Sequence, residues 1–187
     1  RLDLVADAAE RDDFSNPDDW ESSSSEFSEI GIQDETYVIE LKKPNRLAWG
    51  SYDSFKTSGN YLAEVSCKVD VEGGLCGIGF SKDDDNLIWF QVDPKLQEYS
   101  LQYLKAGEWQ DNLIDYTTTA YIAPVGSNSL AIGRQGKTIN LYMNGTLIDS
   151  IDTNPVTNGY VIFGAGTTEN AESAVGTLDD LTVWQVK

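Results

Sequence analysis

The stretch from Tyr61 to Tyr103 holds the side chains best suited to binding chemistry. It reads as period-2 runs separated by turns, which is typical of antiparallel strands with one buried face. An aromatic ring can lie against the apolar face of a sugar, while amide, hydroxyl and charged groups can bond its hydroxyls. The pattern predicts a carbohydrate-binding face, although an ordinary solvated sheet face with one exposed Trp also fits it. The predicted ligand-binding residues are Glu64, Ser66, Lys68, Trp89, Gln91 and Gln102.

Two strands of this stretch set the expected shape of that face. The run before the glycine pair Gly73-Gly74 alternates apolar and polar residues, and the returning run places Gly77 and Gly79 on the parity opposite to its apolar residues. We expect the two runs to pair as a hairpin. Glycines leave an open floor, so the sequence predicts a shallow groove with Trp89 at its side.

Two cysteines, Cys67 and Cys76, fall on the inward parity of these adjacent runs. A cross-strand disulfide is geometrically possible if the pair is a close one. Two buried free thiols that fill core space fit the sequence equally well. A disulfide would place the protein in an oxidising compartment. Two cysteines are too few for a zinc site.

Carboxylates are the remaining groups with catalytic potential, because the chain contains no histidine. Hydrolysis of a glycosidic bond requires two carboxyl groups about 5 to 9.5 Å apart. Glu64 stands alone on its strand, since the positions two residues away are Leu62 and Ser66. The run Asp83 to Asn86 reads as an acidic β-turn or, less directly, as a metal site. These residues disfavour catalysis, and the missing histidine excludes His-based triads and His-ligated zinc.

Composition excludes several partners. The chain of 187 residues carries a net charge of −18 with only 13 Lys and Arg, so we expect no binding to nucleic acid or anionic membranes. No run approaches the roughly 20 apolar residues of a membrane span, so direct membrane insertion is not expected. The chain starts at Arg1 rather than Met, which leaves room for a signal, an anchor or other domains of a larger protein upstream.

The whole chain predicts an all-β fold in one domain, residues 1–187. Residues 1–10 form a lead-in that fits a helical turn, an edge strand or a remnant outside the fold. A hairpin is expected over 27–41 and a meander over 130–151, where Asn144-Gly145 is a strong hairpin signal. Asn144-Gly145-Thr146 also matches the N-glycosylation pattern, but the turn explains it fully. Many short strands with crossing loops predict a two-sheet antiparallel β-sandwich of jelly-roll type.

Several motifs carry a family resemblance. The segments GLCGIGF, DDDNLIWFQV, LYMNGTLI and VGTLDDLTVWQV resemble the bacterial concanavalin A-like (laminin G-like) jelly-roll domains, from about Asp12 to Lys187. That fold serves lectins, carbohydrate-binding modules, glucanases and adhesion modules, many of them secreted or surface-anchored. The resemblance implies that a glucanase would carry E-x-D-x-E on one strand, and no strand here shows it. It also implies a structural Ca²⁺ between the N-terminal segment and the last strand, with Asp12, Asp13 and Asp180 as ligands and Asp179 as a substitute.

Together these observations predict a non-catalytic, lectin-like recognition module that binds a glycan or cell-surface polysaccharide through a concave sheet face. We expect it outside the cytoplasm, in the extracellular space or on the cell surface. Two alternatives stay open at this point. One is a glycan-cleaving enzyme of the concanavalin A-like glucanase type, and the other is a structural or adhesion domain without a small ligand.

Overall fold

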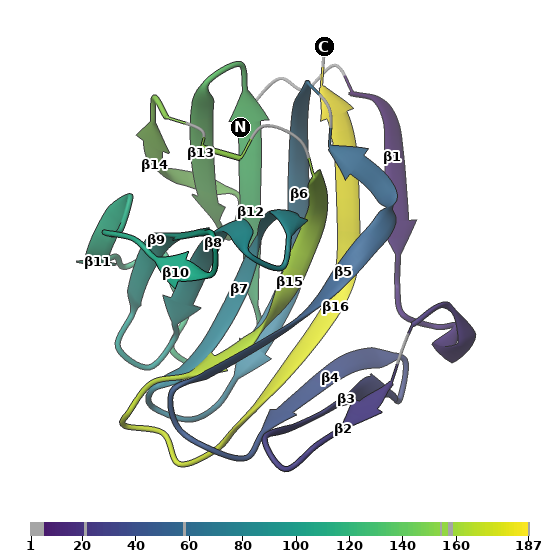
Figure 1. Cartoon of the computed structure of the whole chain (residues 1–187), viewed down its shortest axis with the longest axis vertical. Coiled ribbons are helices and arrows are strands. Elements are labelled where there is room, and N and C mark those ends of the chain that lie inside the picture. The colour runs from purple at the N-terminus through teal and green to yellow at the C-terminus, as the bar shows by residue number, and fades with distance from the viewer. Residues whose placement is uncertain (1–5, 21, 58, 154, 157–158, 187) are drawn as a thin grey trace.

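A computed structural model describes residues 6–20, 22–57, 59–153, 155–156 and 159–186. Over these residues the chain forms sixteen strands and one short 3₁₀ turn, η1 (Pro17–Asp19). The strands make two antiparallel sheets that lie one in front of the other (Figure 1). The predicted all-β sandwich is therefore confirmed. No helix in this part of the chain is long and apolar enough to cross a membrane.

The first sheet has nine strands and contains both ends of the described chain. β1 pairs antiparallel with β16, which supports the edge-strand interpretation of the lead-in and confirms that the last strand lies beside the N-terminal one. The predicted hairpin over 27–41 and the predicted meander are also present. In sheet order the strands are β14 (Thr146–Ile151), β13 (Thr138–Met143), β12 (Asn128–Gln135), β6 (Asn60–Val69), β16 (Ala174–Val186), β4 (Thr36–Leu41), β3 (Ser28–Gln33) and β2 (Ser23–Ser24), with β1 (Ala6–Asp12) against β16.

The second sheet has seven strands and ends at a long edge strand, β5. Within the described chain β5 pairs only with β15, so its other side faces the short strands β2 to β4 across the open flank of the sandwich (Figure 1). In sheet order the strands are β10 (Glu108–Trp109), β9 (Glu98–Lys105), β8 (Asn86–Asp93), β7 (Gly74–Asp83), β15 (Gly159–Thr167) and β5 (Arg46–Thr57), with β11 (Ile114–Thr118) against β9.

Alternating side chains build the core between the sheets. β6 alternates buried and half-buried residues along its whole length, with Val65 inward and Glu64 outward. Ile78, Phe90 and Phe163 of the second sheet meet these apolar side chains from the opposite layer. Asn144 and Gly145 both adopt positive φ, 50° and 76°, in the turn between β13 and β14, as a two-residue hairpin requires.

The predicted hairpin between the two runs that flank Gly73-Gly74 was wrong. β6 belongs to the nine-stranded sheet and β7 to the seven-stranded sheet, so the chain crosses from one layer to the other at this turn. A tight turn between two alternating runs fits both a hairpin within one sheet and a crossing between two sheets. In both arrangements the same residues of each run point toward the core. The disulfide between Cys67 and Cys76 is confirmed, with Cα atoms 6.2 Å apart, and it joins the two sheets instead of two paired strands.

Candidate functional site

The predicted glycine-floored groove is filled by Trp89 itself. Its ring lies over Gly77 so closely that a Cβ at that position would come within 2.1 Å of a ring carbon. Trp89 is 0% exposed and packs with Leu87, Leu104 and Ile162, which form a second apolar cluster on this outer face of the seven-stranded sheet. The prediction that Trp89 turns toward the glycine side is confirmed. A fully buried indole cannot offer its face to a sugar, so its assignment as a ligand plate is corrected.

The amides predicted beside Trp89 bond within the protein. The indole Nε1–H donates to Gln91 Oε1 at 3.1 Å, and Gln91 Nε2 donates to the Tyr116 hydroxyl at 2.9 Å. Gln102 Nε2 reaches the same hydroxyl at 3.3 Å. This polar chain runs from the buried indole to the exposed Tyr116, and it is stabilising because the buried indole N–H has a partner. It fixes the centre of the sheet face and leaves Gln91 little capacity for a ligand.

The remaining predicted ligand residues lie on the other side of the molecule. Glu64, Ser66 and Lys68 are on the outer face of β6, in the nine-stranded sheet. Glu64 accepts a hydrogen bond from Ser129 Oγ, and Lys68 Nζ pairs with Asp70 at 2.8 Å. The predicted set is therefore divided between two opposite faces and forms no single site.

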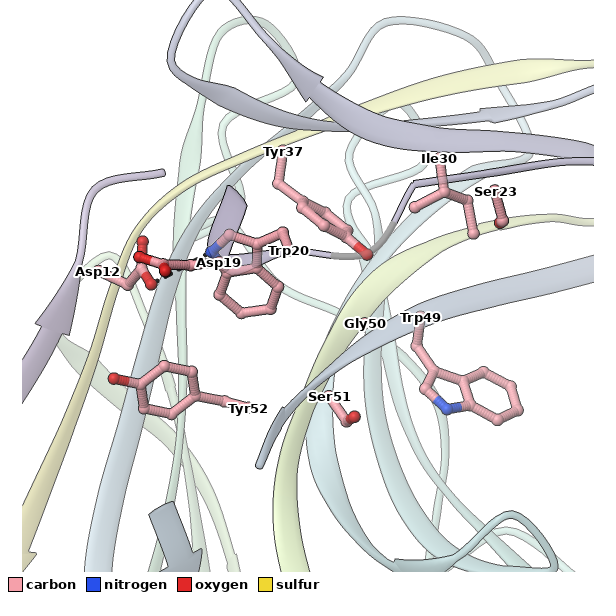
Figure 2. Close-up of a pocket in the computed structure, with 10 residues that line it drawn as sticks. All are labelled: Asp12, Asp19, Trp20, Ser23, Ile30, Tyr37, Trp49, Gly50, Ser51 and Tyr52. Atoms are coloured by element: carbon pink, nitrogen blue, oxygen red, sulfur yellow. Dashed lines mark hydrogen bonds between the residues drawn. The ribbon is translucent and has the colours of Figure 1, made fainter. Parts of the chain in front are cut away.

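An open hollow occurs instead along the edge strand β5, and we call it the edge hollow. It encloses about 690 Å³ between β5, the short strands β2 to β4 and the segment that follows β1 (Figure 2). Its lining combines aromatic rings, hydroxyl groups and carboxylates. The lining residues are Asp12, Asp19, Trp20, Ser23, Ile30, Tyr37, Trp49, Gly50, Ser51 and Tyr52.

A smaller hollow of about 360 Å³ adjoins the edge hollow. The two share Trp49 and Ser51 of β5, so they follow one another across the edge strand. The second hollow adds a further pair of acidic residues, Asp83 and Asp84. Together the two hollows form a depression across β5, with Asp12 and Asp19 in the edge hollow, Asp83 and Asp84 in the adjoining hollow, and Trp49 in both.

Stacked aromatic residues shape the wall of the edge hollow. The half-buried Trp20 stacks on Tyr52 with ring centroids 5.9 Å apart and an interplanar angle of 22°, and it meets Tyr37 edge-on at 5.3 Å. Phe14 supports this group from the core, fully buried and with φ of 55°. A bulky residue at positive φ is strained, and such strain is concentrated at functional sites.

The carboxylates of the edge hollow differ in their surroundings. Asp12 accepts hydrogen bonds from the Phe14 amide at 2.8 Å and from the Trp20 indole at 3.2 Å, which hold it in one orientation (Figure 2). Asp19 is exposed and accepts no hydrogen bond from a residue that the structure describes. Burial, followed by the nearby charges of Glu10, Asp12 and Asp19, raises the pKa of Tyr52. This tyrosine is therefore surrounded by negative charge.

The residues predicted to bind Ca²⁺ have other partners. Asp180 pairs with Arg11, and Asp13 accepts hydrogen bonds from Ser15, which lower the pKa of Asp13. Across the described residues there is no group of three or more His, Cys, Asp or Glu that could hold a metal ion. The calcium site at Asp12, Asp13 and Asp180 stays a prediction.

Two further motifs act as turns. Asp83 accepts hydrogen bonds from the Asn86 side chain at 2.7 Å and the Asp85 amide at 3.1 Å, and the Asn86 bond lowers the pKa of Asp83. Asn144 Nδ2 donates to the Tyr121 carbonyl at 2.7 Å and to Asn128 Oδ1 at 2.9 Å. The Asn144 amide thus joins the hairpin to the loop before β12, which supports the turn interpretation over glycosylation.

Sequence reasoning missed the edge hollow because its walls come from segments far apart in the chain. The lining residues lie in 12–20, 23–37 and 49–52, and local patterns carry no information on which of these segments meet. A usable signal was present in the sequence. The segment RLAWGSY contains aromatic residues, and a run of acidic residues lies only a few strands before it.

Comparison with known proteins identifies the fold. No family model matches the sequence, and no curated protein matches it. Solved structures do match. A β-glucanase from Bacillus licheniformis has a TM-score of 0.68 at 13% identity, covering 96% of this chain and 98% of that chain. The Crh5 transglycosylase, solved in complex with NAG, has a TM-score of 0.69 at 14% identity, with coverages of 98% and 86%.

The catalytic domain of an endo-1,3-beta-glucanase (laminarinase) from Thermotoga petrophila matches equally well. Its TM-score is 0.68 at 10% identity, with 99% of both chains covered. The chain thus has the concanavalin A-like jelly-roll fold, as predicted. These matches correct the predictions of a non-catalytic recognition module and of no enzyme, because the three structures that share the fold over most of their length are named as a glucanase, a transglycosylase and a laminarinase.

Proposed function

We propose that this chain cleaves glycosidic bonds of a polysaccharide at the edge hollow. One observation carries the proposal: two carboxylates, Asp12 and Asp19, line a hollow of about 690 Å³ whose wall is the stacked pair Trp20 and Tyr52. Aromatic rings hold the apolar faces of sugars, and a pair of carboxyl groups is the usual equipment for glycoside hydrolysis.

The chemistry assigns different tasks to the two carboxyl groups. One protonates the oxygen of the leaving sugar, while the other activates water or attacks the anomeric carbon. Asp12 is held in one orientation by two N–H donors, which suits the nucleophile or base. Asp19 is exposed and accepts no hydrogen bond from a described residue, so it can turn toward the departing oxygen as the acid. Tyr52 stacks on Trp20 and lines the same hollow, where its hydroxyl can bond to a sugar hydroxyl.

The central strand β8 of the same sheet carries one carboxylate, opposite Glu98 of β9. The outward positions of β8 are Leu87, Trp89, Gln91 and Asp93, and the last of these is its sole carboxylate. Asp93 is buried and accepts hydrogen bonds from the amides of Gly73, Lys95 and Leu96. Its lone pairs are used to fix two turns. Asp93 therefore has little capacity left for catalysis, and the edge hollow is the better candidate.

The similar enzymes supply independent support for a glycan substrate. Their names describe a glucanase, a transglycosylase and a laminarinase. We also propose that the protein works outside the cytoplasm, in the extracellular space or on the cell surface. The buried disulfide between Cys67 and Cys76 supports this location, because such bonds persist in oxidising compartments.

Release of reducing ends from a panel of polysaccharides tests the proposal. The wild type should cleave at least one of them, and Asp19→Asn and Asp12→Asn should each lower kcat by at least about 100-fold, the usual contribution of an acid or base. Asp18→Asn is the matched control, because Asp18 lies in the same 3₁₀ turn and outside the hollow. Melting curves identify a variant that has lost its fold. Absence of cleavage by the wild type, or full activity in both lining variants, would contradict the proposal.

A further inference from the structure

We propose that the edge hollow is selective for a cationic glycan, one whose sugar units carry free amino groups. This inference rests on the proposed function for the identity of the ligand as a glycan, but it concerns binding and can be tested without any cleavage. The cavity, the arrangement of its aromatic rings and the sign of the charges that line it carry the argument.

The charges that line both hollows are all negative in the described part of the chain. Asp12 and Asp19 line the edge hollow, Asp83 and Asp84 line the adjoining one, and neither lining contains a described Lys or Arg. Glu10 adds a further negative charge beside Tyr52. A glycan with carboxylate or sulfate groups would meet like charges at each end of this depression, which costs binding free energy.

Lys82 offsets part of the charge of Asp83 in the adjoining hollow, but three other cations near the edge hollow have partners elsewhere. Arg11 pairs with Asp180, Lys42 Nζ lies 3.1 Å from Glu29, and Lys43 Nζ lies 3.1 Å from Glu26. None of these three cations lines either hollow. The net charge of −18 extends the same negative potential over the surrounding surface. A cationic ligand is therefore attracted at a distance as well as in contact.

The aromatic wall favours the same ligand. Trp20 and Tyr52 stack beside the carboxylates, and a protonated amine is attracted both to an aromatic face and to a carboxylate. A neutral sugar can use the rings but gains no ion pair. Occupation of the site by a metal ion alone is disfavoured, because the described residues include no cluster able to hold one. An amino sugar uses both the rings and the charges.

Calorimetric titration with glucosamine oligomers and N-acetylglucosamine oligomers of equal length tests the inference. The two ligands share the same chain and differ in the amine. With wild-type protein at low salt, and at a pH where the amine is protonated, we expect the free-amine oligomer to bind at least about tenfold more tightly. Raising the ionic strength should reduce this preference. Asp19→Asn should remove most of it, whereas the matched control Asp18→Asn should retain most of it.

The possible outcomes separate the two proposals. Equal binding of both oligomers, or an undiminished preference in Asp19→Asn, overturns the cationic selectivity while leaving cleavage of neutral glycans intact. Tight, salt-sensitive binding of the free-amine oligomer without cleavage supports the selectivity and contradicts the proposed function. Failure of the wild type to bind either oligomer, or preference for a uronic acid oligomer used as a third ligand, also overturns the selectivity.

Discussion

The centre of the seven-stranded sheet and its β5 edge carry similar residues in opposite states. At the centre, Trp89 is fully buried and its indole N–H is bonded to Gln91. At the edge, Trp20 and Trp49 are half-buried and line a hollow with Asp19 exposed. Both regions combine indoles with polar groups, but Trp49 packs with the outer cluster of Trp89, whereas Trp20 packs against the core between the sheets. The difference teaches that the direction of a side chain and its accessibility are separate properties.

The largest expected effect separates the two regions by stability. Trp89→Ala should lower the free energy of unfolding by about 3–5 kcal/mol, because it empties a packed cluster. Trp49→Ala, in a half-buried side chain, should cost roughly 1 kcal/mol and weaken glycan binding instead. Urea unfolding and glycan titration measure both quantities. If folded Trp89→Ala protein lost glycan binding while Trp49→Ala kept it, the site would lie at the centre.

Removal of the disulfide should have the next largest effect. The bond closes a loop across a sequence separation of 9, and the Cys67→Ser/Cys76→Ser variant should lose roughly 2–3 kcal/mol of unfolding free energy on chain-entropy grounds. Glycan binding, measured under conditions where the variant is fully folded, should persist, because the edge hollow is built from other segments. Thermal unfolding and titration of the two proteins provide the measurement. If the variant lost stability and its folded molecules also bound the glycan more weakly, the disulfide and the edge hollow would be coupled.

A smaller effect tests the close fit of Trp89 on its glycine floor. Gly77→Ala places a Cβ 2.1 Å from the Trp89 ring, so the ring must move, at a cost of about 1–3 kcal/mol. Gly31→Ala is the matched control in the other sheet, since its Cβ would meet only Ser22 at 3.4 Å. Denaturant unfolding of both variants gives the difference. Equal stability of the two variants would mean that the centre is loosely packed and open to a ligand.

Much of the architecture follows from local pattern. Alternation identified which residues of β6, β7 and β8 face the core, and Asn144-Gly145 placed a hairpin correctly. The same pattern could not show that β6 and β7 lie in different sheets, because alternation is identical whether a neighbouring strand is beside it or across the core. Because of this error, Glu64 and Lys68 were predicted to share a face with Trp89, although they lie on the other sheet, on the opposite side of the molecule.

The site was less predictable than the fold. The contacts of Phe14 with Trp20 and of Trp20 with Tyr52 of β5 depend on how distant segments of the chain converge. Nor does a glycine reveal from sequence whether the space above it is vacant. Gly77 has no side chain because the Trp89 ring occupies that space, and the neighbouring strand supplies the ring.

The bridge between Cys67 and Cys76 has a consequence for the order of assembly. Both cysteines belong to the first half of the chain, whereas β12, β15 and β16, which flank β6 and β7 in the finished sheets, come later. Both cysteines are therefore synthesised before those partners, and their bond can form as soon as this part of the chain enters an oxidising compartment. The bond can thus link β6 of one sheet to β7 of the other before the sheets are complete. The later strands can then pair with β6 and β7 when the distance between the two layers is already fixed.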